Sequence, residues 1–354
     1  MRLAIPARGP VLAVAGLTLI LALLQLSGLA FWQGLAVNLA IFVILVVSLN
    51  LASGFTGVFS LGHIGFMALG AYISAILSLP LREKGEYLPS LPSWLAGIHL
   101  DQMLGPIPIG WLLATVLAGV LVAGVALLVG AVLMRLSGHF VAVATLGFLV
   151  IVRVLLFNAD DFTRGSRTFS NVTPYTNMWW ASASAVLVVY VVWRLKRSSY
   201  GRAMFAQRRD RWAAQSVGIS VLTPRLIAFV VSAFFTAIAG SLFAHFITSF
   251  SPTVFYFDLT FRVITMLVVG GMGSVTGSVI GVGVVLAIAE GLRRVEDSTL
   301  LYGLSGILLA AFFISVIIFR PDGIMGQREI SLDGLLARLR PSRNAPAEGP
   351  PPEP

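Results

Sequence analysis

RLKRSSYGRAMFAQRRDRWAAQSVG, residues 194–218, is a basic interruption in a chain that is otherwise apolar. It carries seven Lys and Arg residues and one acid, Asp210. Apolar segments long enough to cross a bilayer flank it on both sides. Basic loops between membrane spans are retained in the cytoplasm, so the segment predicts a cytoplasmic loop. Its small residues Ala213, Ala214 and Gly218 indicate a helix that docks onto another protein.

The composition is that of an integral membrane protein. Of the 354 residues, 57% are hydrophobic and 11% charged, whereas soluble domains carry about 25% charged residues. The net charge of +9 is explained by arginines retained in cytoplasmic loops, so no nucleic-acid partner is expected. The chain has no cysteine, and its four histidines are scattered. Disulfides and thiolate sites are thereby excluded, and no metal site is expected.

Apolar periodicity predicts an all-α, polytopic membrane protein with about ten transmembrane helices. A span needs roughly 20 apolar residues. The N-terminal apolar run is interpreted as the first span rather than as a cleaved signal peptide. The glycine-rich GGMGSVTGS, residues 270–278, is expected to be a tight cytoplasmic turn between two short helices. The predicted spans are 11–31, 35–52, 62–79, 109–134, 139–158, 178–195, 224–248, 260–272, 277–293 and 299–319.

The distribution of basic residues predicts the orientation. With a cytoplasmic N-terminus, sixteen Lys and Arg residues fall on the inner side and seven on the outer side. This asymmetry favours cytoplasmic N- and C-termini in a bacterial inner membrane. Residues 80–108 then form an outer loop or a short surface helix. Residues 1–326 are predicted to form the transmembrane domain, and the Pro-rich residues 327–354 a disordered cytoplasmic tail.

A second unusual stretch is SGFTGVFSLGHIGFMALGAY, residues 53–72, in which glycines lie among Ser, Thr and His. Such a segment can interrupt a helix inside the membrane and present backbone groups to a solute, provided that protein or a cavity surrounds it. Close helix packing through small residues explains Gly62, Gly65 and Gly70 equally well. His63 is either a neutral packing residue or an ionisable group on a solute pathway.

Arg153 is the one basic residue clearly inside a predicted span. It either snorkels toward the outer interface or attracts the carboxylate of a solute. The fifteen acids lie almost entirely in predicted loops and tail, whereas an ion-coupled carrier is expected to keep a carboxylate near the membrane midplane. No GxxxxGK[ST] motif is present either, so the chain is not expected to bind ATP through a P-loop.

Five motifs together resemble the permease family of bacterial branched-chain amino acid ABC importers, particularly its longer member. The resemblance covers roughly residues 35–326, and its first and third motifs in combination are specific. The motifs are NLASGFTGVFSLGHIGFMALGAY (50–72), LSGHFVAVATLGFLVIVRVL (136–155), YGRAMFAQRRDRWAAQSVGIS (200–220), LVVGGMGSVTGSVIG (267–281) and FRPDGIMG (319–326).

The resemblance implies a fold similar to that of the vitamin B12 and ribose permeases. It implies that residues 200–218 form a cytoplasmic coupling helix seated in a groove of an ATPase subunit, through Gly201, Arg202, Ala206, Arg208, Asp210, Ala213, Ala214 and Gly218. The positions that match the family's solute pathway are Ser60, Gly62, His63, Phe66, Gly70, Thr145 and Arg153.

The implied partners are a second homologous permease, two ATP-binding cassette subunits, a periplasmic solute-binding protein and membrane lipid. ATP and Mg²⁺ belong to the ATPase subunits, so this chain is expected to hold no cofactor and to catalyse no reaction itself. Arg164 and Thr168 stand where the family often has glycine, which leaves the solute open among branched-chain amino acids, amides, urea and organic or aromatic acids. An ion-coupled secondary transporter of a small solute is the alternative.

Overall fold

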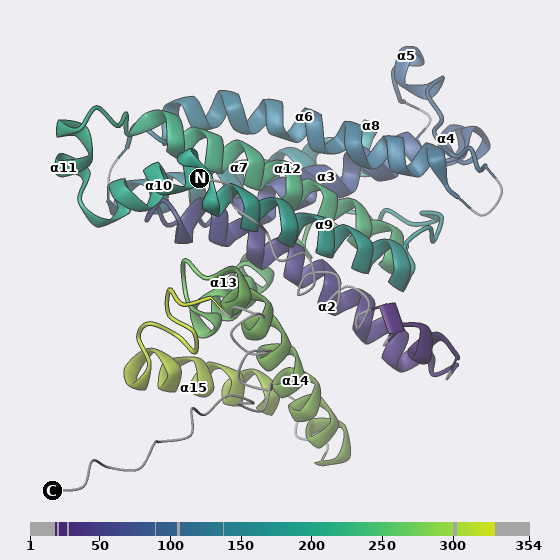
Figure 1. Ribbon diagram of the computed structural model, residues 1–354. Coiled ribbons are helices and arrows are strands. Elements are labelled where there is room, and N and C mark those ends of the chain that lie inside the picture. The colour runs from purple at the N-terminus through teal and green to yellow at the C-terminus, as the bar shows by residue number, and fades with distance from the viewer. Residues whose placement is uncertain are drawn as a thin grey trace, which may run out of the picture.

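The computed structural model describes residues 18–19, 21–26, 28–88, 90–104, 107–136, 138–299 and 303–329. The regular secondary structure in this part of the chain is helical (Figure 1), and its only β-structure is two isolated bridges, Leu104–Ile107 and Phe169–Phe250. The first predicted span, 11–31, falls largely outside the described residues. Every later predicted span coincides with a helix, so the prediction of an all-α, polytopic membrane protein is confirmed.

Six of the described helices are long and apolar enough to cross a membrane. The first is α2 (Ala30–Leu49), which continues into the π-helix η1 (Asn50–Gly54). The other five are α6 (Ile109–Leu133), α7 (His139–Asn158), α9 (Met178–Arg197), α12 (Leu222–Ile247) and α14 (Val275–Thr299). Two shorter apolar helices are α3 (His63–Ser78) and α15 (Leu304–Phe319), and α13 (Phe257–Gly270) completes the set.

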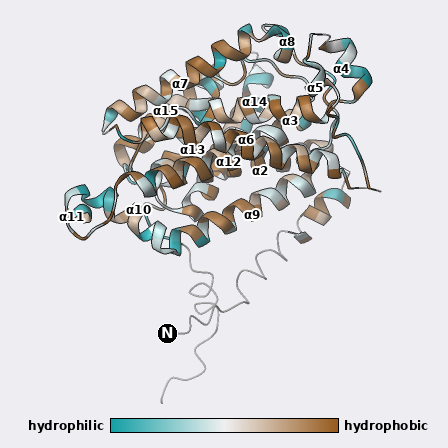
Figure 2. Ribbon diagram, turned by 90° about the horizontal axis from the view of Figure 1, so that it is seen from above, coloured by the Kyte–Doolittle hydropathy of each residue, from teal (hydrophilic) through white to brown (hydrophobic). Residues whose placement is uncertain are grey.

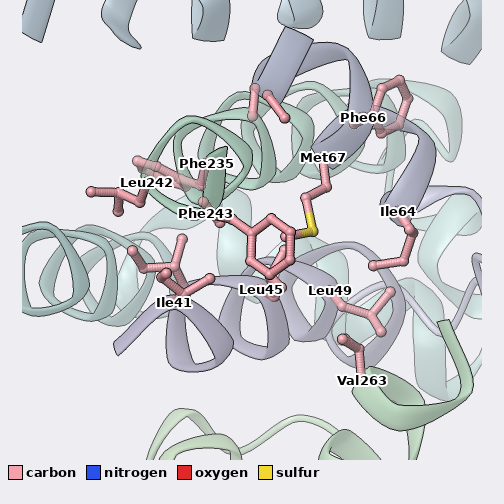
Figure 3. Close-up of a cluster of buried hydrophobic side chains, with 14 of the residues drawn as sticks. Ile41, Leu45, Leu49, Ile64, Phe66, Met67, Phe235, Leu242, Phe243 and Val263 are labelled. Carbon is pink, nitrogen blue, oxygen red and sulfur yellow. The ribbon is translucent and has the colours of Figure 1, made fainter. Parts of the chain in front are cut away.

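The core of the bundle lies where α2, α3 and α12 meet. Figure 3 shows Leu45 of α2, Met67 of α3 and Phe243 of α12 in one buried cluster, with Val263 of α13 at its edge. The backbones of α3 and α12 approach each other closely because glycine stands at the contact. A Cβ atom placed on Gly70 would lie 2.5 Å from the Cα of Ala237. Small residues thus allow the tight helix packing that membrane interiors favour.

The polar residues gather at the two ends of the bundle (Figure 2). One end carries the short helices α4 (Leu81–Tyr87), α5 (Ser93–Ala96) and α8 (Asp160–Thr163). The opposite end carries α10 (Ser199–Arg209) and α11 (Arg211–Ser216) (Figure 1). The expectation that 80–108 and 194–218 lie on opposite sides is consistent with this arrangement.

The glycine-rich segment 270–278 contains a turn between two separate helices, as expected, with α13 ending at Gly270 and α14 beginning at Val275. Gly271 and Gly273 have φ values of 109° and 101°, which L-residues with a side chain rarely adopt. The prediction of two short helices is only half right, because α13 has 14 residues but α14 has 25. Close packing accompanies the turn, since a Cβ on Gly281 would lie 2.7 Å from the Cα of Gly270.

The chain after α15 folds back onto this turn. The backbone N–H of Ile324 donates to the carbonyl of Val269 at 2.8 Å. Further on, the carbonyl of Arg328 accepts from the Ser274 hydroxyl at 2.7 Å. The predicted boundary of the disordered tail at residue 327 therefore falls within a hydrogen-bonded segment. Residues 330–354, the remainder of that predicted tail, lie outside the described residues.

Candidate functional site

A break in the helical path of the chain creates the first candidate site. The α-helical hydrogen bonding of α2 gives way to the π-helix η1, residues 55–62 are non-helical, and α3 begins at His63. Most of this segment is buried inside the bundle. Non-helical backbone is tolerated at membrane depth only where protein or a water-filled cavity surrounds it. The interruption expected from the glycine-rich motif is thus present.

His63 lies at the centre of a buried polar cluster at this break. Its Nδ1 lies 3.0 Å from the Ser60 hydroxyl, and its Nε2 lies 2.9 Å from the hydroxyl of Ser232 on α12. The backbone N–H of Leu61 donates to the Thr145 hydroxyl at 3.0 Å, which ties the break to α7. All polar atoms of the His63 ring therefore have partners, as a buried imidazole requires.

Gly62 and Phe66 fix the same region by packing. A Cβ on Gly62 would lie 2.8 Å from the carbonyl oxygen of Thr145, so only glycine fits at this approach of the break to α7. The Phe66 ring centroid lies 4.8 Å from that of Phe148 on α7. A narrow cleft opens beside this cluster between α2, α3 and α13, lined by Leu49, Ser60, Leu61, His63, Ile64, Thr260, Val263 and Ile264.

Five of the seven pathway candidates are thus brought together: Ser60, Gly62, His63, Phe66 and Thr145. Gly70 lies farther along α3, where it contacts the backbone of α12 and serves packing. Arg153 lies on α7 with its guanidinium carbon 3.8 Å from the centroid of the Tyr256 ring. This cation–π contact anchors the loop that leads into α13, and it places Arg153 apart from the His63 cluster.

The second candidate site is the basic segment at one end of the bundle. The expected single helix over 200–218 is in fact two helices, α10 and α11. Asp210 separates them, with φ −149° and ψ 113°, and its carboxylate accepts from the N–H groups of Trp212 and Ala213. It therefore ends α10 and caps α11. Gly218, with φ +83°, follows the end of α11 in the left-handed conformation that glycine favours.

The predicted docking residues divide between an exposed and an inward face. Arg202, Asp210, Ala213 and Gly218 are exposed, and Ala206 is half-buried. Ala214 is buried, and Gly201 packs against the preceding helix, where an added Cβ would lie 2.6 Å from the carbonyl carbon of Lys196. Gly201 and Ala214 thus pack inward in this structure, and their part in docking stays a prediction.

Two large apolar side chains that the sequence analysis did not single out are exposed on α11 and just after it. Trp212 is 79% exposed and Val217 is 73% exposed. The end of α9 and α10 form a shallow hollow lined by Lys196, Arg202, Phe205, Ala206 and Arg209. Exposed aromatic and apolar residues among arginines are typical of a protein–protein contact.

Arg208 points into the protein rather than outward. Its Nη1 donates to the carbonyls of Gly54, at the end of η1, and of Met272, in the α13–α14 turn. Burial lowers the pKa of Arg208 below its ordinary value. Because an arginine remains protonated even so, its charge is stabilised by these carbonyl dipoles.

Four further residues of these sites were not found from the sequence. Ser232 is a single hydroxyl in an apolar helix and gives no signal. Asn50 is fully buried, and its side chain binds the α13–α14 turn. Lys196 donates to the carbonyl of Gly273 and pairs with Glu329, with Nζ 2.5 Å from the carboxylate. Asn50 and Lys196 stand out in the printed sequence only as rare polar residues at helix ends.

Glu329 also caps the start of α14. Its carboxylate accepts from the N–H groups of Val275 and Thr276 and from the Thr276 hydroxyl. Burial raises the pKa of Glu329, but the hydrogen bonds from Lys196, Thr276 and Val275 outweigh it, so the pKa lies below its ordinary value. A carboxylate at a helix N-terminus is stabilised in the same sense by the helix dipole. No group of three or more metal-ligating side chains occurs within the described residues.

The structure is a bundle of apolar helices long enough to cross a membrane, and the chain between α2 and α3 is non-helical around a buried polar cluster. These features define a multi-pass membrane protein. The family model for the permease component of branched-chain amino acid transport systems matches residues 32–318. The chain therefore belongs to this permease family. No solved structure matches the chain.

Curated relatives include both permeases of one transport system. The chain is 30% identical over 319 residues to the high-affinity branched-chain amino acid transport system permease protein LivM of Escherichia coli, covering 80% of this chain and 68% of that protein. It is 32% identical over 178 residues to LivH of the same organism, covering 49% of this chain and 55% of LivH. A probable LivM of Methanocaldococcus jannaschii is 21% identical over 336 residues, which cover 86% of this chain and 94% of that protein.

Proposed function

We propose that this chain is a transmembrane permease subunit of an ATP-driven ABC importer, which moves branched-chain amino acids or a related small polar solute inward. The observation that carries the proposal is the combination of the family match with the exposed Trp212 and Arg202 at the basic end of the bundle. A permease of this kind needs a surface through which a separate ATPase drives it. The permease itself catalyses no reaction, and ATP and Mg²⁺ are bound by the ATPase subunits.

The proposed orientation follows from the charge at the two ends. The end that carries α10 and α11 is cytoplasmic because its loops hold the excess of arginine. The described residues 320–329 return to this same end, which supports a cytoplasmic C-terminus. The outer end, with α4 and α5, faces the periplasm and receives the solute-binding protein. The membrane is the bacterial inner membrane.

A second permease is proposed as the partner within the bilayer. Sequence similarity to both LivM and LivH supports this, because the two carry the name of one transport system in the same organism. Many side chains of α6, α7 and α15 are exposed in this single chain, which leaves apolar surface for lipid and for a second subunit.

The proposed solute pathway passes the break between α2 and α3. Ser60 and His63 supply hydroxyl and imidazole groups that line the cleft toward α13, which has a volume of about 10 Å³ in this conformation, and Thr145 lies buried behind them. Hydroxyl and imidazole groups suit a small polar solute, whose own polar groups need partners inside the membrane. A structural change that widens this cleft opens the path.

The test is uptake of labelled leucine into proteoliposomes that hold this chain, a LivH-like permease, the ATPases and the binding protein, with and without internal ATP. ATP-dependent accumulation is expected. If ATP is hydrolysed in response to the binding protein but leucine does not accumulate, the importer role stands and the solute is a different one. If no ATPase associates with this chain, the proposal is refuted.

The docking surface has its own test. Replacing Arg202 with Glu and Trp212 with Ala together removes the exposed charge and aromatic ring, so co-purification of the ATPase is expected to fall at least tenfold. Trp94→Ala is the matched control, because Trp94 is 69% exposed on α5 at the opposite end. Undiminished co-purification of the double variant would show that the ATPase binds elsewhere.

A further inference from the structure

Arg208 joins α10 to two segments that are distant in sequence. Its guanidinium donates to the carbonyl of Gly54, the last residue of the π-helix η1, and to that of Met272 at 3.3 Å. These contacts bridge 154 and 64 positions of the chain. Arg208 therefore lies on the line between the surface that docks the ATPase and the break in the helical bundle.

The surroundings of Arg208 fit its side chain closely. A Cβ on Gly57 would lie 2.9 Å from the Arg208 Cγ, and a Cβ on Gly273 would lie 2.7 Å from its Nη1. Both glycines also have positive φ, 73° and 101°, so the backbone there is held in a conformation that favours glycine. The arginine is lodged between two backbone segments, and a shift of α10 must move them with it.

Asn50 binds these two segments to each other. Its fully buried amide donates to the carbonyl of Ser274 and to the hydroxyl of Ser278, and its oxygen accepts from the N–H of Gly273, each at 2.8 Å. Breaking such a buried network leaves unpaired polar groups, which costs about 1–3 kcal/mol for each. The π-helix and the α13–α14 turn therefore move as one unit.

The break itself begins at this unit. Residues 55–62 lead directly from Gly54 to His63, and the N–H of Ser60 donates to the hydroxyl of Ser53 in η1 at 3.1 Å. Ser60 in turn contacts His63 at 3.0 Å. A displacement of Gly54 is transmitted to the polar cluster through one short stretch of chain.

We propose that Arg208 is a positioning residue that transmits displacement of α10 to the break between α2 and α3, and so couples ATPase movement to the opening of the pathway. The inference rests on the importer role proposed above and assigns to Arg208 a part distinct from docking. Arg202 and Trp212 hold the ATPase, whereas Arg208 carries its movement inward.

The experiment uses the absence of cysteine from the chain. A single reporter, Leu61→Cys, is introduced at the break, where the side chain is half-buried. The full complex is reconstituted in proteoliposomes, and the rate of labelling by a small thiol reagent is measured before and after the ATPase is trapped with ADP and vanadate. This readout requires no knowledge of the solute.

Trapping is expected to change the labelling rate at least fivefold in the complex with Arg208 intact. In Arg208→Gln the change is expected to fall below twofold, while ATPase co-purification and ATP hydrolysis remain above half. Arg208→Lys is expected to recover part of the response, since an ammonium group can still donate to one of the two carbonyls. Arg328→Gln is the matched control: its side chain is exposed and only its carbonyl contacts this region, so the full response is expected.

Several results overturn the inference. A reporter that does not respond with Arg208 intact shows that the break is not moved by the ATPase. An equal response in Arg208→Gln shows that the movement bypasses Arg208. Loss of ATPase co-purification in that variant assigns Arg208 to docking instead. Failure of the ATPase to associate even with the unsubstituted chain refutes the importer role itself and is thereby distinguished from these results.

Discussion

Replacing Gly70 with Ala is expected to destabilise the bundle through the contact of α3 with α12. The new Cβ would lie 2.5 Å from the Cα of Ala237, whereas carbon atoms in contact are about 3.5–4.0 Å apart. The two helices must separate by roughly 1 Å to relieve the clash. The obstacle is backbone in a continuous helix, so no side-chain rotation can relieve it.

The expected magnitude combines two opposing effects. Overpacking of a tight contact costs about 1–3 kcal/mol, and we place this one at the upper end because backbone meets backbone. Alanine regains about 1 kcal/mol of helix propensity over glycine. Since the unfolding entropy is about 2.1 cal/mol/K per residue and the chain has 354 residues, the net loss of about 2 kcal/mol corresponds to a fall in apparent Tm of about 3 °C.

The assay is thermal unfolding of the purified chain in detergent. Gly124→Ala on α6 and Gly147→Ala on α7 are matched controls, because a Cβ at either position meets nothing within 4 Å. Both are expected to leave Tm unchanged or to raise it. An unchanged Tm for Gly70→Ala, or an equal fall in the controls, would refute the packing argument and return Gly70 to the solute pathway.

Three further predictions concern single contacts. Asp210→Ala removes the cap of α11 and is expected to cost about 1 kcal/mol, seen as faster amide hydrogen exchange in α11 but not in α7. Tyr256→Leu removes the cation–π contact with Arg153, at about 0.5–1 kcal/mol, whereas Tyr256→Phe retains it; equal Tm values for the two variants would contradict this. Glu329 has a lowered pKa, so its cap on α14 is present at neutral pH and lost as pH falls through that pKa. As the pH falls through this pKa, hydrogen exchange of the Val275 amide is expected to accelerate relative to its intrinsic rate. Glu329→Gln is expected to abolish this dependence on pH.

The break between α2 and α3 was predictable because its signal is local. Glycines among Ser, Thr and His favour an interruption of the helix in 53–62, and the structure places Ser60, His63 and Thr145 together there. Gly65 and Gly70 instead lie within the continuous helix α3. Ser232 was not predictable, because one serine in an apolar helix does not reveal which neighbour it faces. The division of 200–218 into two helices had a signal that was overlooked, since Asp210 precedes an alanine-containing turn and is a preferred N-cap residue.

The inward direction of the Arg208 side chain could not be predicted from the sequence. On a short basic helix every arginine looks equally suited to an outer partner, and the sequence does not show which way each one points. Arg202 is exposed whereas Arg208 is half-buried, because η1 and the α13–α14 turn cover the part of α10 that carries Arg208. Glu329 was assigned to a disordered tail because of the nearby Pro-rich composition. The sequence does not show that its carboxylate lies within reach of four donors, which come from Lys196, Val275 and Thr276.

The apolar helical segments and the basic loop follow from the sequence, because transfer of apolar side chains into lipid depends on composition and length alone. The count of about ten spans stays a prediction, since six of the described helices are long and apolar enough to cross a membrane. The contacts of Asn50, Arg208 and Lys196 with the turn at 271–274 depend on tertiary structure. Each joins segments that are far apart in the chain, and a hydrogen bond forms only where folding has brought the donor within about 3 Å of its acceptor.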